Sequence, residues 1–313
     1  MIAMLLQVLF NGAASGGVYA LVALGYSLVF SVLGVINFAQ GALFSLGGYL
    51  TYLLLGGRIG VNGAWPGWGL PTGLPLLAAL LLAAVGSGLM GLLVERVAFT
   101  PLRRRGAEPL LALISSLGAG VVLVNLLQIV MGAEGYAFPM GGSSLAGLPE
   151  SLLIAGARLR TIQLLLLVIA AAAVVALTLW LERSRGGKAL RAVAEDATTA
   201  QLLGIDSDGM VRLAFLISGA LAGLGGGLIG VSVSLAGPYF GITYGLKGLA
   251  VLVLGGLGSL PGAIAGGLLM GLAEALVPSD ASGWRDALAF AILFAVLLLR
   301  PSGLLGRRQV DKV

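Results

Sequence analysis

The sequence predicts an all-α integral membrane protein, a polytopic helical bundle of roughly eight to ten transmembrane segments with broken or re-entrant helices. Three observations support this fold class. The 313 residues are 58% hydrophobic and 10% charged, with a mean hydropathy of +1.05, whereas soluble domains carry about 25% charged residues. The apolar residues form long runs, separated by short loops that are charged or rich in Gly and Pro. Glycines interrupt some of these runs.

The hydrophobic runs define the predicted elements of a single domain that covers 1–313. We expect spans at about 5–32, 34–55, 74–98, 109–131, 162–182 and 211–235, two shorter segments at 242–258 and 262–277, and a last span at about 287–300. A transmembrane helix needs about 20 apolar residues, so the two short segments are predicted to be broken or re-entrant. The Gly/Pro-rich stretches at 56–73 and 132–161 are predicted loops outside the membrane.

The basic residues predict the orientation. Loops at 96–108, 183–212 and 300–313 hold thirteen of the eighteen Lys and Arg residues. Such loops stay in the cytoplasm, so we expect the C-terminus inside and the N-terminus outside. No basic residue precedes Arg58, and a secretory signal needs a positive start. The first apolar run is therefore expected to remain in the mature protein.

The composition argues against several classes of function. Cysteine and histidine are both absent, which removes disulfides, thiol nucleophiles and the commonest metal ligand and general base. We therefore expect no catalytic residue, no metal site and no cofactor bound by this chain. The basic residues lie in short loops between spans, where they act as topology signals rather than as a nucleic-acid surface. The chain contains no Walker A sequence, so any ATP must be bound by another subunit.

One charged segment, at 183–212, interrupts the apolar sequence. Within it, Leu190, Val193, Ala194 and Ala197 recur at helical spacing and predict a short helix with one apolar face. Gly204 is placed to end this helix, as glycine often does. An amphipathic helix in a cytoplasmic loop is either a docking surface for a partner or a solvated connector that lies on the lipid headgroups.

Two glycine-broken stretches, 33–49 and 246–263, are candidates for the substrate path, because interrupted segments in the two halves of a transporter point to its binding site. The alternative is a short loop at the membrane face. Burying an unpaired amide costs about 1–3 kcal/mol, so the polar side chains here need partners or water. The predicted path residues are Asn37, Gln40, Ser45, Gly255, Gly256 and Gly258. In the packing alternative, Asn37 caps the second helix and Gln40 joins two helices.

Several motifs together resemble the permeases of branched-chain amino-acid ABC importers, and among these the LivH-type subunit. The motifs are YALVALGYSLVFSVLG followed by INFAQG, ERVAFTPLR at 95–103, RAVAEDATTAQLLGI at 191–205, VLGGLGSLPGAIAGGLLMGLAEAL at 253–276 and RPSGLLG at 300–306. The resemblance extends from about residue 10 to the C-terminus. Where the family usually has His-Gly-Glu after INFA, this chain has Gln40-Gly41-Ala42.

The resemblance implies an importer in the cell inner membrane. Its other parts would be a second, LivM-like permease, two cytoplasmic ATPases that bind ATP and Mg, and an extracytoplasmic solute-binding protein. The charged segment would then be the coupling loop to an ATPase. The coupling residues are predicted to be Lys188, Leu190, Arg191, Val193, Ala194, Glu195, Asp196, Ala197, Leu203 and Gly204.

Other functions remain open at this point. The same scaffold carries importers of urea, amides and aromatic acids. A different class, a stand-alone secondary transporter or channel, would need ionisable groups within the membrane. Lys247 and Glu274 are the candidates for such groups, and both are expected near span ends, where they can reach water.

Overall fold

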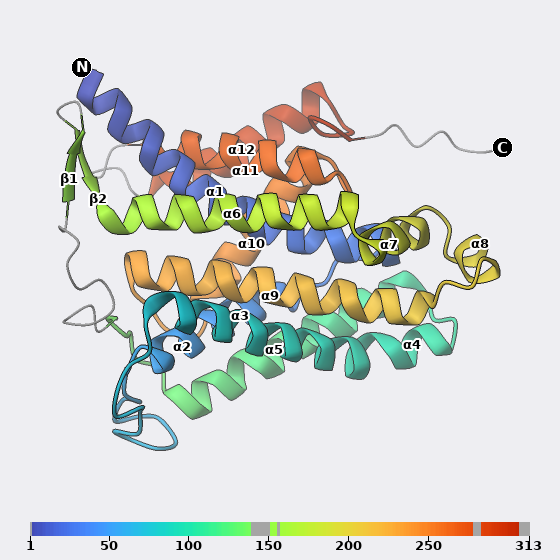
Figure 1. Cartoon of the computed structure of the whole chain (residues 1–313), viewed down its shortest axis with the longest axis horizontal. Helices are drawn as coiled ribbons and strands as arrows, with labels where there is room; N and C mark the ends of the chain where they lie inside the picture. Colours follow the sequence, from blue (N-terminus) through green and yellow to red (C-terminus); the bar gives the residue numbers. More distant parts are fainter. Residues whose placement is uncertain (1, 139–150, 155–156, 278–282, 307–313) are drawn as a thin grey trace.

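The computed structural model describes residues 2–138, 151–154, 157–277 and 283–306, and within them it is a bundle of helices (Figure 1). The helices are α1 (Ile2–Leu33), α2 (Gln40–Leu54), α3 (Leu76–Val94), the π-helix η1 (Glu95–Phe99), α4 (Thr100–Arg104), α5 (Pro109–Met131), α6 (Thr161–Arg183), α7 (Arg185–Glu195), α8 (Ala197–Leu202), α9 (Ser207–Val233), α10 (Phe240–Gly255), α11 (Leu260–Ala275) and α12 (Trp284–Leu299). The predicted polytopic all-α fold is confirmed.

The predicted hydrophobic runs correspond to α1, α2, α3, α5, α6, α9, α10, α11 and α12. Among the described residues, five helices are long and apolar enough to cross a membrane, and the α10–α11 pair makes a sixth crossing if counted as one. That pair is bent by 120°, so the prediction of a broken segment there is confirmed. A β-hairpin, Ser151–Ile154 with Ala157–Arg160, lies in the predicted loop at 132–161. Residues 139–150 of that loop lie outside the described part.

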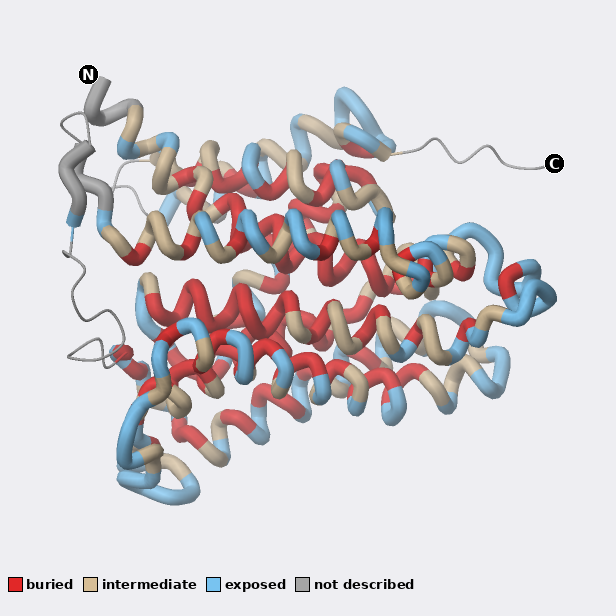
Figure 2. The backbone as a smooth tube through the Cα atoms, in the orientation of Figure 1, coloured by how far each residue is buried: buried red, intermediate tan, exposed pale blue. Residues whose placement is uncertain are grey.

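The helices differ sharply in how much of their surface the bundle covers (Figure 2). The most apolar stretch of α9 is 83% buried, whereas that of α5 is only 17% buried. Leucine and valine side chains cover the exposed faces of α3, α5 and α6. Helices that are apolar on the outside as well as the inside are typical of proteins embedded in lipid.

Glycines allow the central helices to approach closely. A Cβ built on Gly16 would lie 2.8 Å from the carbonyl oxygen of Gly267, and one on Gly12 would lie 2.8 Å from Cα of Leu272. These contacts join α1 to α11. Small residues take this role within membranes, where backbone packing replaces the hydrophobic effect between helices.

The two halves of the bundle repeat one arrangement in opposite orientation. Each half has a long helix (α1 or α9), a break, a short helix that starts inside the bundle (α2 or α10), and a third helix (α3 or α11). α1 packs against α11, and α9 packs against α3. The end of α1 lies beside the start of α9 in one cavity, so the two long helices run in opposite directions. Inverted repeats of this kind are typical of transporter folds.

The breaks at 34–39 and 234–239 have the backbone conformations that end a helix. Gly34 has φ +66° and Gly237 has φ +125°, values that favour glycine. Ser234 has φ +74°, and Pro238 lacks the N–H that a continuing helix would need. The sequence predicts the first break from its glycines and polar residues. The second separates the spans predicted at 211–235 and 242–258, and the break expected within 246–263 is the bend between α10 and α11.

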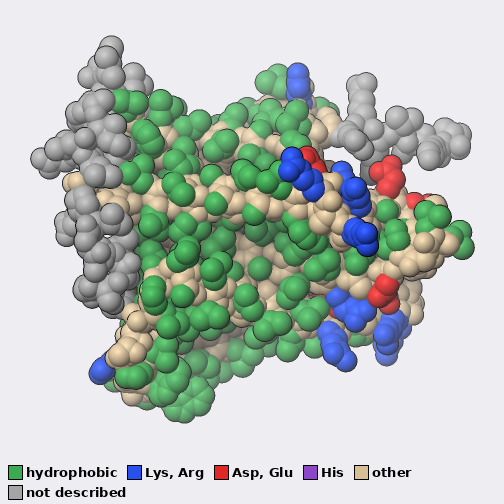
Figure 3. All heavy atoms as spheres, in the orientation of Figure 1, with side chains coloured by type: hydrophobic (Ala, Val, Ile, Leu, Met, Phe, Trp, Pro, Cys, Tyr) green, Lys and Arg blue, Asp and Glu red, His purple; other side chains and the backbone are tan. Residues whose placement is uncertain are grey.

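Charged side chains gather at one end of the bundle (Figure 3). α4, α7 and α8 lie at this end (Figure 1). Arg300 belongs there too, since residues 302–306 pack on the turn between α10 and α11. The described parts of the three basic loops therefore share one end of the bundle, as the orientation prediction requires.

Candidate functional site

The charged segment forms two helices rather than one. Ser184 caps α7, with its hydroxyl accepting a hydrogen bond from the Gly187 amide at 2.9 Å. Asp196 then leaves the helical conformation at φ −156°, and its carboxylate accepts hydrogen bonds from the amides of Thr198 and Thr199 at 2.8 and 3.1 Å. Asp196 is therefore the N-cap of α8, a role for which aspartate is favoured. The predicted stop is confirmed, because Gly204 follows α8 with φ +82°.

The apolar face of α7 does not point to a partner, as the coupling prediction for Leu190 and Val193 requires. Leu190 and Val193 are each only 2% exposed, and α7 packs on α1, α6 and α9 of the same chain. The helical spacing identified a buried face correctly, but the permease bundle itself covers that face. Ala197 is exposed and Ala194 is intermediate.

Other residues of the segment present their side chains to the outside. The exposed predicted residues are Lys188, Arg191, Glu195, Asp196, Ala197, Leu203 and Gly204. Leu202 and Leu203 are 84% and 76% exposed at the tip of α8. The sequence analysis missed Leu202, although two adjacent leucines in a polar segment are a signal that could have identified it.

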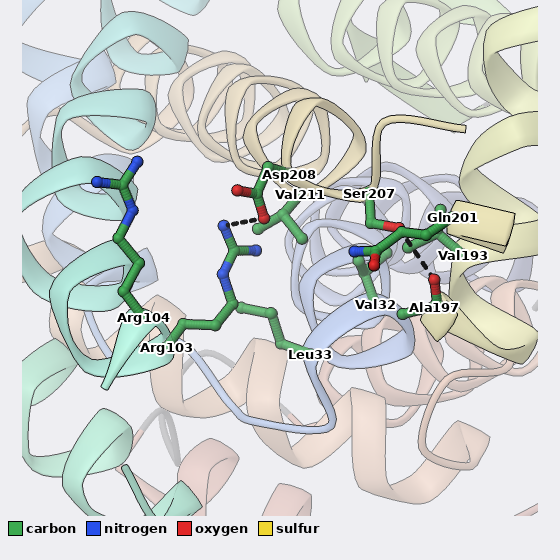
Figure 4. A pocket seen from close by; sticks show the side chains of 10 residues that line it. All are labelled: Val32, Leu33, Arg103, Arg104, Val193, Ala197, Gln201, Ser207, Asp208 and Val211. Carbon is green, nitrogen blue, oxygen red and sulfur yellow. Dashed lines mark hydrogen bonds and ion pairs between the residues drawn. The ribbon is translucent and has the colours of Figure 1, made fainter. Parts of the chain in front are cut away.

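A cavity of about 240 Å³ lies behind α8, between the end of α1, α4 and the start of α9. Arg103 of α4 pairs with Asp208 of α9 at 2.9 Å (Figure 4). The Ser207 hydroxyl donates to the backbone oxygen of Ala197 at 3.1 Å (Figure 4). The first contact joins α4 to the start of α9, and the second joins α8 to it. A displacement of α8 would therefore act directly on a central helix of the bundle.

Asn37, Gln40 and Ser45 are all buried inside the bundle, with at most 1% of each exposed. The Gln40 amide donates to the backbone oxygen of Ser218 at 3.1 Å and accepts from the Ser218 hydroxyl at 3.0 Å. That hydroxyl has a single proton, which it shares between Gln40 and the backbone oxygen of Gly25, 2.7 Å away. Gln40 therefore joins α2 to α9, as the packing alternative predicted.

Asn37 lies in the first break, where its side-chain oxygen accepts a hydrogen bond from the Ala39 amide at 3.1 Å. This local contact closes a turn just before α2, but it is not the cap that the packing alternative predicted, because the N-cap of α2 is Ala39 and no side chain caps this helix. Its side-chain nitrogen is buried without a hydrogen-bond partner among the described residues. An unsatisfied buried amide is costly, so this group could take a ligand or water.

Ser45 connects the two halves of the bundle. Its hydroxyl donates to the backbone oxygen of Pro238 at 2.7 Å and accepts from the Gly241 amide at 3.0 Å. A Cβ on Gly41 would lie 2.8 Å from the carbonyl oxygen of Gly241. The starts of α2 and α10 therefore meet backbone to backbone. The sequence analysis missed Gly241, whose signal was the preceding Gly-Pro pair in an apolar run.

The turn containing Gly255, Gly256 and Gly258 was expected opposite or adjacent to Asn37 and Gln40, and the structure does not place it next to the start of α2, which meets Gly241 instead. The Leu304 and Leu305 amides donate to the backbone oxygens of Leu254 and Gly255 at 2.8 and 3.0 Å. The turn therefore lies at the charged end, against residues 302–306. The reason is that α10 meets α2 with its first turn, so its last turn is a helix length away.

Lys247 and Glu274 were expected near span ends, where they could reach water. Glu274 is indeed the last but one residue of α11, but Lys247 lies in the middle of α10, and both residues are buried. They are 8% and 7% exposed, and Lys247 Nζ lies 2.9 Å from a carboxylate oxygen of Glu274. The Tyr19 hydroxyl donates to the other carboxylate oxygen at 2.5 Å. This cluster joins α10, α11 and the middle of α1. The bend between α10 and α11 brings the two charges together, which no spacing in the sequence indicates.

Comparison with known proteins places the chain in a family. Residues 8–299 match the family described as branched-chain amino acid transport system / permease component. The high-affinity branched-chain amino acid transport system permease protein LivH of Escherichia coli K12 is 38% identical over 98% of this chain and 97% of its own length. The corresponding protein BraD of Pseudomonas aeruginosa is 37% identical over 98% of both chains. A probable LivH of Methanocaldococcus jannaschii is 28% identical over 91% of this chain. The chain belongs to this permease family.

A permease component of a transport system is not itself an enzyme, and its task is to open a route through the membrane. The matched region contains α1 to α12 almost completely, including the charged segment, both breaks and the Lys247–Glu274 pair. Among the described residues, no group of acidic side chains could hold a metal ion. The candidate functional features of this family member are therefore conformational: two half-helices that meet inside the bundle and a charged segment that protrudes from it.

Proposed function

We propose that this chain is the LivH-type permease subunit of an ATP-driven importer of branched-chain amino acids. The observation that supports this most strongly is the identity of 37–38% with LivH and BraD over almost the whole chain. In this proposal the chain forms a heterodimer with a LivM-like permease in the cell inner membrane. Two cytoplasmic ATPases bind ATP and Mg, and an extracytoplasmic binding protein delivers the amino acid. The N-terminus lies outside and the C-terminus in the cytoplasm.

The experiment that tests the substrate is uptake into proteoliposomes that contain the complete importer and its binding protein. We expect ATP-dependent accumulation of leucine, isoleucine and valine, and no accumulation of urea or an aromatic acid. A matched control omits the binding protein. Accumulation of urea in preference to leucine would contradict the proposed substrate, while uptake that needs neither ATP nor partners would contradict the importer.

We propose that the charged segment docks on an ATPase through α8 and the exposed edge of α7. Leu202 and Leu203 expose adjacent apolar side chains to water, and exposed apolar patches often mark the contact site of a partner protein. Arg191 and Glu195 on α7 are exposed charges of opposite sign, which can set the register of a complex. The buried Leu190 has a different role in this proposal, because it holds α7 on the bundle.

Three variants separate these roles in a pull-down of the ATPase. Leu203→Asp should abolish association and transport-coupled ATP hydrolysis, because it places a charge in the apolar contact. Val61→Asp, at a side chain that is 83% exposed at the other end of the bundle, should change neither. Leu190→Asp should reduce the amount of folded permease itself. Association that survives Leu203→Asp would refute α8 as the docking element.

We propose that the solute passes close to Asn37, Gln40 and Ser45, where the two half-helices start. The unsatisfied Asn37 amide and the backbone groups freed by the two breaks support a polar route at this depth. The glycines at 255, 256 and 258 act instead as the hinge of the α10–α11 pair. Asn37→Leu should slow leucine uptake in an assembled importer, whereas Gln40→Leu should first reduce assembly. Unchanged uptake in assembled Asn37→Leu protein would exclude this residue from the route.

A further inference from the structure

The Lys247–Glu274 pair is unusual for its position. Both residues are buried, with 8% and 7% of their surface exposed, and they lie beside Tyr19, near the middle of the 32-residue helix α1. Charged groups at this depth are costly in a membrane protein and mark functional positions. A buried ion pair is not needed for stability, since well-packed apolar side chains do as well. The pair is therefore a candidate for a function that needs charge.

The groups around the pair match the head of an amino acid. Glu274 accepts a hydrogen bond from Tyr19, and Lys247 Nζ lies 5.7 and 5.8 Å from the ring centres of Tyr19 and Tyr244. Aromatic faces stabilise an ammonium group at such distances. A zwitterion carries one carboxylate and one ammonium group close together. Its carboxylate can replace Glu274 as the partner of Lys247, and its ammonium can replace Lys247 as the partner of Glu274.

An apolar surface adjoins these charges. The Tyr244 ring stacks on Phe44 with the ring centres 5.2 Å apart, and Phe240 lies 5.6 Å from Phe44. These rings come from α2 and α10, next to the place where the two half-helices meet. A site at the ion pair would thus present charge to the head of an amino acid and aromatic carbon to an aliphatic side chain, which is the combination that ligand sites usually have.

The helix α1 offers a polar approach to the pair. Residues 11, 15, 19, 22 and 26 follow one another at spacings of four, four, three and four, so they lie on one face. α10 covers the lower part of this face, where Gly248 packs on Val22. Helix α10 starts at Phe240, one turn before Tyr244, whose ring lies beside that of Tyr19. Above that level Ser15 is only partly buried.

The same face continues to Asn11, which is also only partly buried as a residue. Its side-chain oxygen is buried and has no hydrogen-bond partner among the described residues. Asn11 and Ser15 are thus two polar side chains that lead from the N-terminal end of α1 to Tyr19. In the proposed orientation, that end faces the binding protein.

We propose that Lys247, Glu274 and Tyr19 form an intramembrane site for the zwitterionic head of an amino acid, reached from outside along Asn11 and Ser15. The solute enters by exchanging its two charges for those of the ion pair, so no unpaired charge is left in the membrane. This proposal rests on the proposed function for its substrate class. It places a head-group site on α1, α10 and α11, beyond the path residues of α2.

Cysteine protection in the complete importer tests this site. The chain has no cysteine, so Ser15→Cys introduces one thiol of nearly the original size. A membrane-impermeant thiol reagent added from outside should modify Ser15→Cys. Val168→Cys on α6, at a side chain that is 65% exposed but surrounded by other apolar residues, is the control that should stay unmodified. No modification of Ser15→Cys would overturn the proposed access.

Protection by solutes then identifies the chemistry. Leucine should slow the modification, whereas 3-methylbutylamine and 4-methylpentanoate, which each lack one charge, should do so only at much higher concentration. Adding Glu274→Gln should weaken protection by leucine roughly ten- to a hundredfold, the effect of losing a hydrogen bond to a charged group. Equal protection by all three compounds, or none by leucine, would overturn the site.

A second measurement guards against variants that do not assemble. The double variant Lys247→Met with Glu274→Leu keeps the packing and removes both charges. If it assembles and imports leucine with an unchanged KM and rate, the pair serves packing alone. Failure of the proposed function looks different, since the unmodified importer would then not accumulate leucine at all.

Discussion

The two halves of this permease share an arrangement but differ in what holds their short helices. In the first half, the Gln40 amide and the Ser218 hydroxyl fix the start of α2 with uncharged hydrogen bonds. In the second half, the Lys247–Glu274 ion pair fixes α10 to α11, and Tyr19 adds α1. The same fold therefore uses neutral contacts on one side of its pseudo-symmetry and charges on the other.

This difference separates two tasks. Neutral contacts such as those of Gln40 satisfy buried polar groups at moderate cost. A buried ion pair costs more free energy because both charges lose their water. Removing one partner then destabilises the protein strongly, because the other charge stays buried. The contact between Gly41 and Gly241, which belongs equally to both halves, holds the starts of α2 and α10 together, and we call this contact the framework. Four predictions test this ranking, beginning with the framework.

The glycine contact between the half-helices should be the most sensitive place. Gly41→Val puts a side chain 2.8 Å from the Gly241 carbonyl oxygen. Ordinary overpacking is relieved by small shifts of side chains and backbone, but here backbone faces backbone and the two half-helices would have to separate. We expect almost no monodisperse protein in size-exclusion chromatography. Gly241→Val should behave alike, because it enters the same contact from the other half. The matched control is Gly118→Val on α5, where the added Cβ meets no atom of another described element within 4 Å. A normal yield of Gly41→Val would show that the framework is pliable.

Breaking the charged contact should cost more than breaking the neutral one. Glu274→Leu leaves Lys247 buried without its carboxylate partner, which should lower the free energy of unfolding by about 3–5 kcal/mol. Gln40→Leu leaves the Ser218 hydroxyl bonded to Gly25, so we expect about 1–3 kcal/mol. Thermal unfolding of the purified permease complex measures both. Replacing Lys247 by Met in the Glu274→Leu protein should recover most of the loss. Equal losses in the two single variants would remove the distinction between the halves.

The Ser45 hydroxyl crosses between the halves, and its loss should have an intermediate effect. Ser45→Ala leaves the Gly241 amide and the Pro238 oxygen without their partner, at about 1–3 kcal/mol. Ser31→Ala is the control, since Ser31 bonds only to Leu28 in its own helix, and we expect it to stay within about 0.5 kcal/mol. Unfolding midpoints should therefore fall for Ser45→Ala alone. A drop of the same size in both would mean that the contact between the halves contributes nothing of its own.

The opposite orientation of the halves can be read out with almost no effect on stability. α2 is followed by the loop that holds Val61, and α10 by the turn that holds Leu257, which are 83% and 47% exposed. Val61→Cys should react with an impermeant reagent only from outside, and Leu257→Cys only from the cytoplasm. Transport should remain near the original rate in both. Labelling of both from the same side would be incompatible with inverted halves.

The sequence determined the broad architecture and several of its boundaries. The apolar runs give the helices, since lipid tolerates no other spanning element here. The break before α2, the bend between α10 and α11 and the end of α8 at Gly204 were all predicted from glycine. Glycine determines these places locally, because few other residues adopt its backbone conformations.

Only the tertiary structure decided which surfaces and charges meet. Helical spacing indicated that Leu190 and Val193 share an apolar face, but not that α7 packs that face on its own bundle. Within the membrane the pattern is weaker still, because lipid and protein interior are both apolar and favour the same side chains. From the sequence alone, Lys247 and Glu274 each look like a charged side chain near a span end that extends to water. Their pairing depends on a 120° bend, and the position of such a pair is a property of the folded chain.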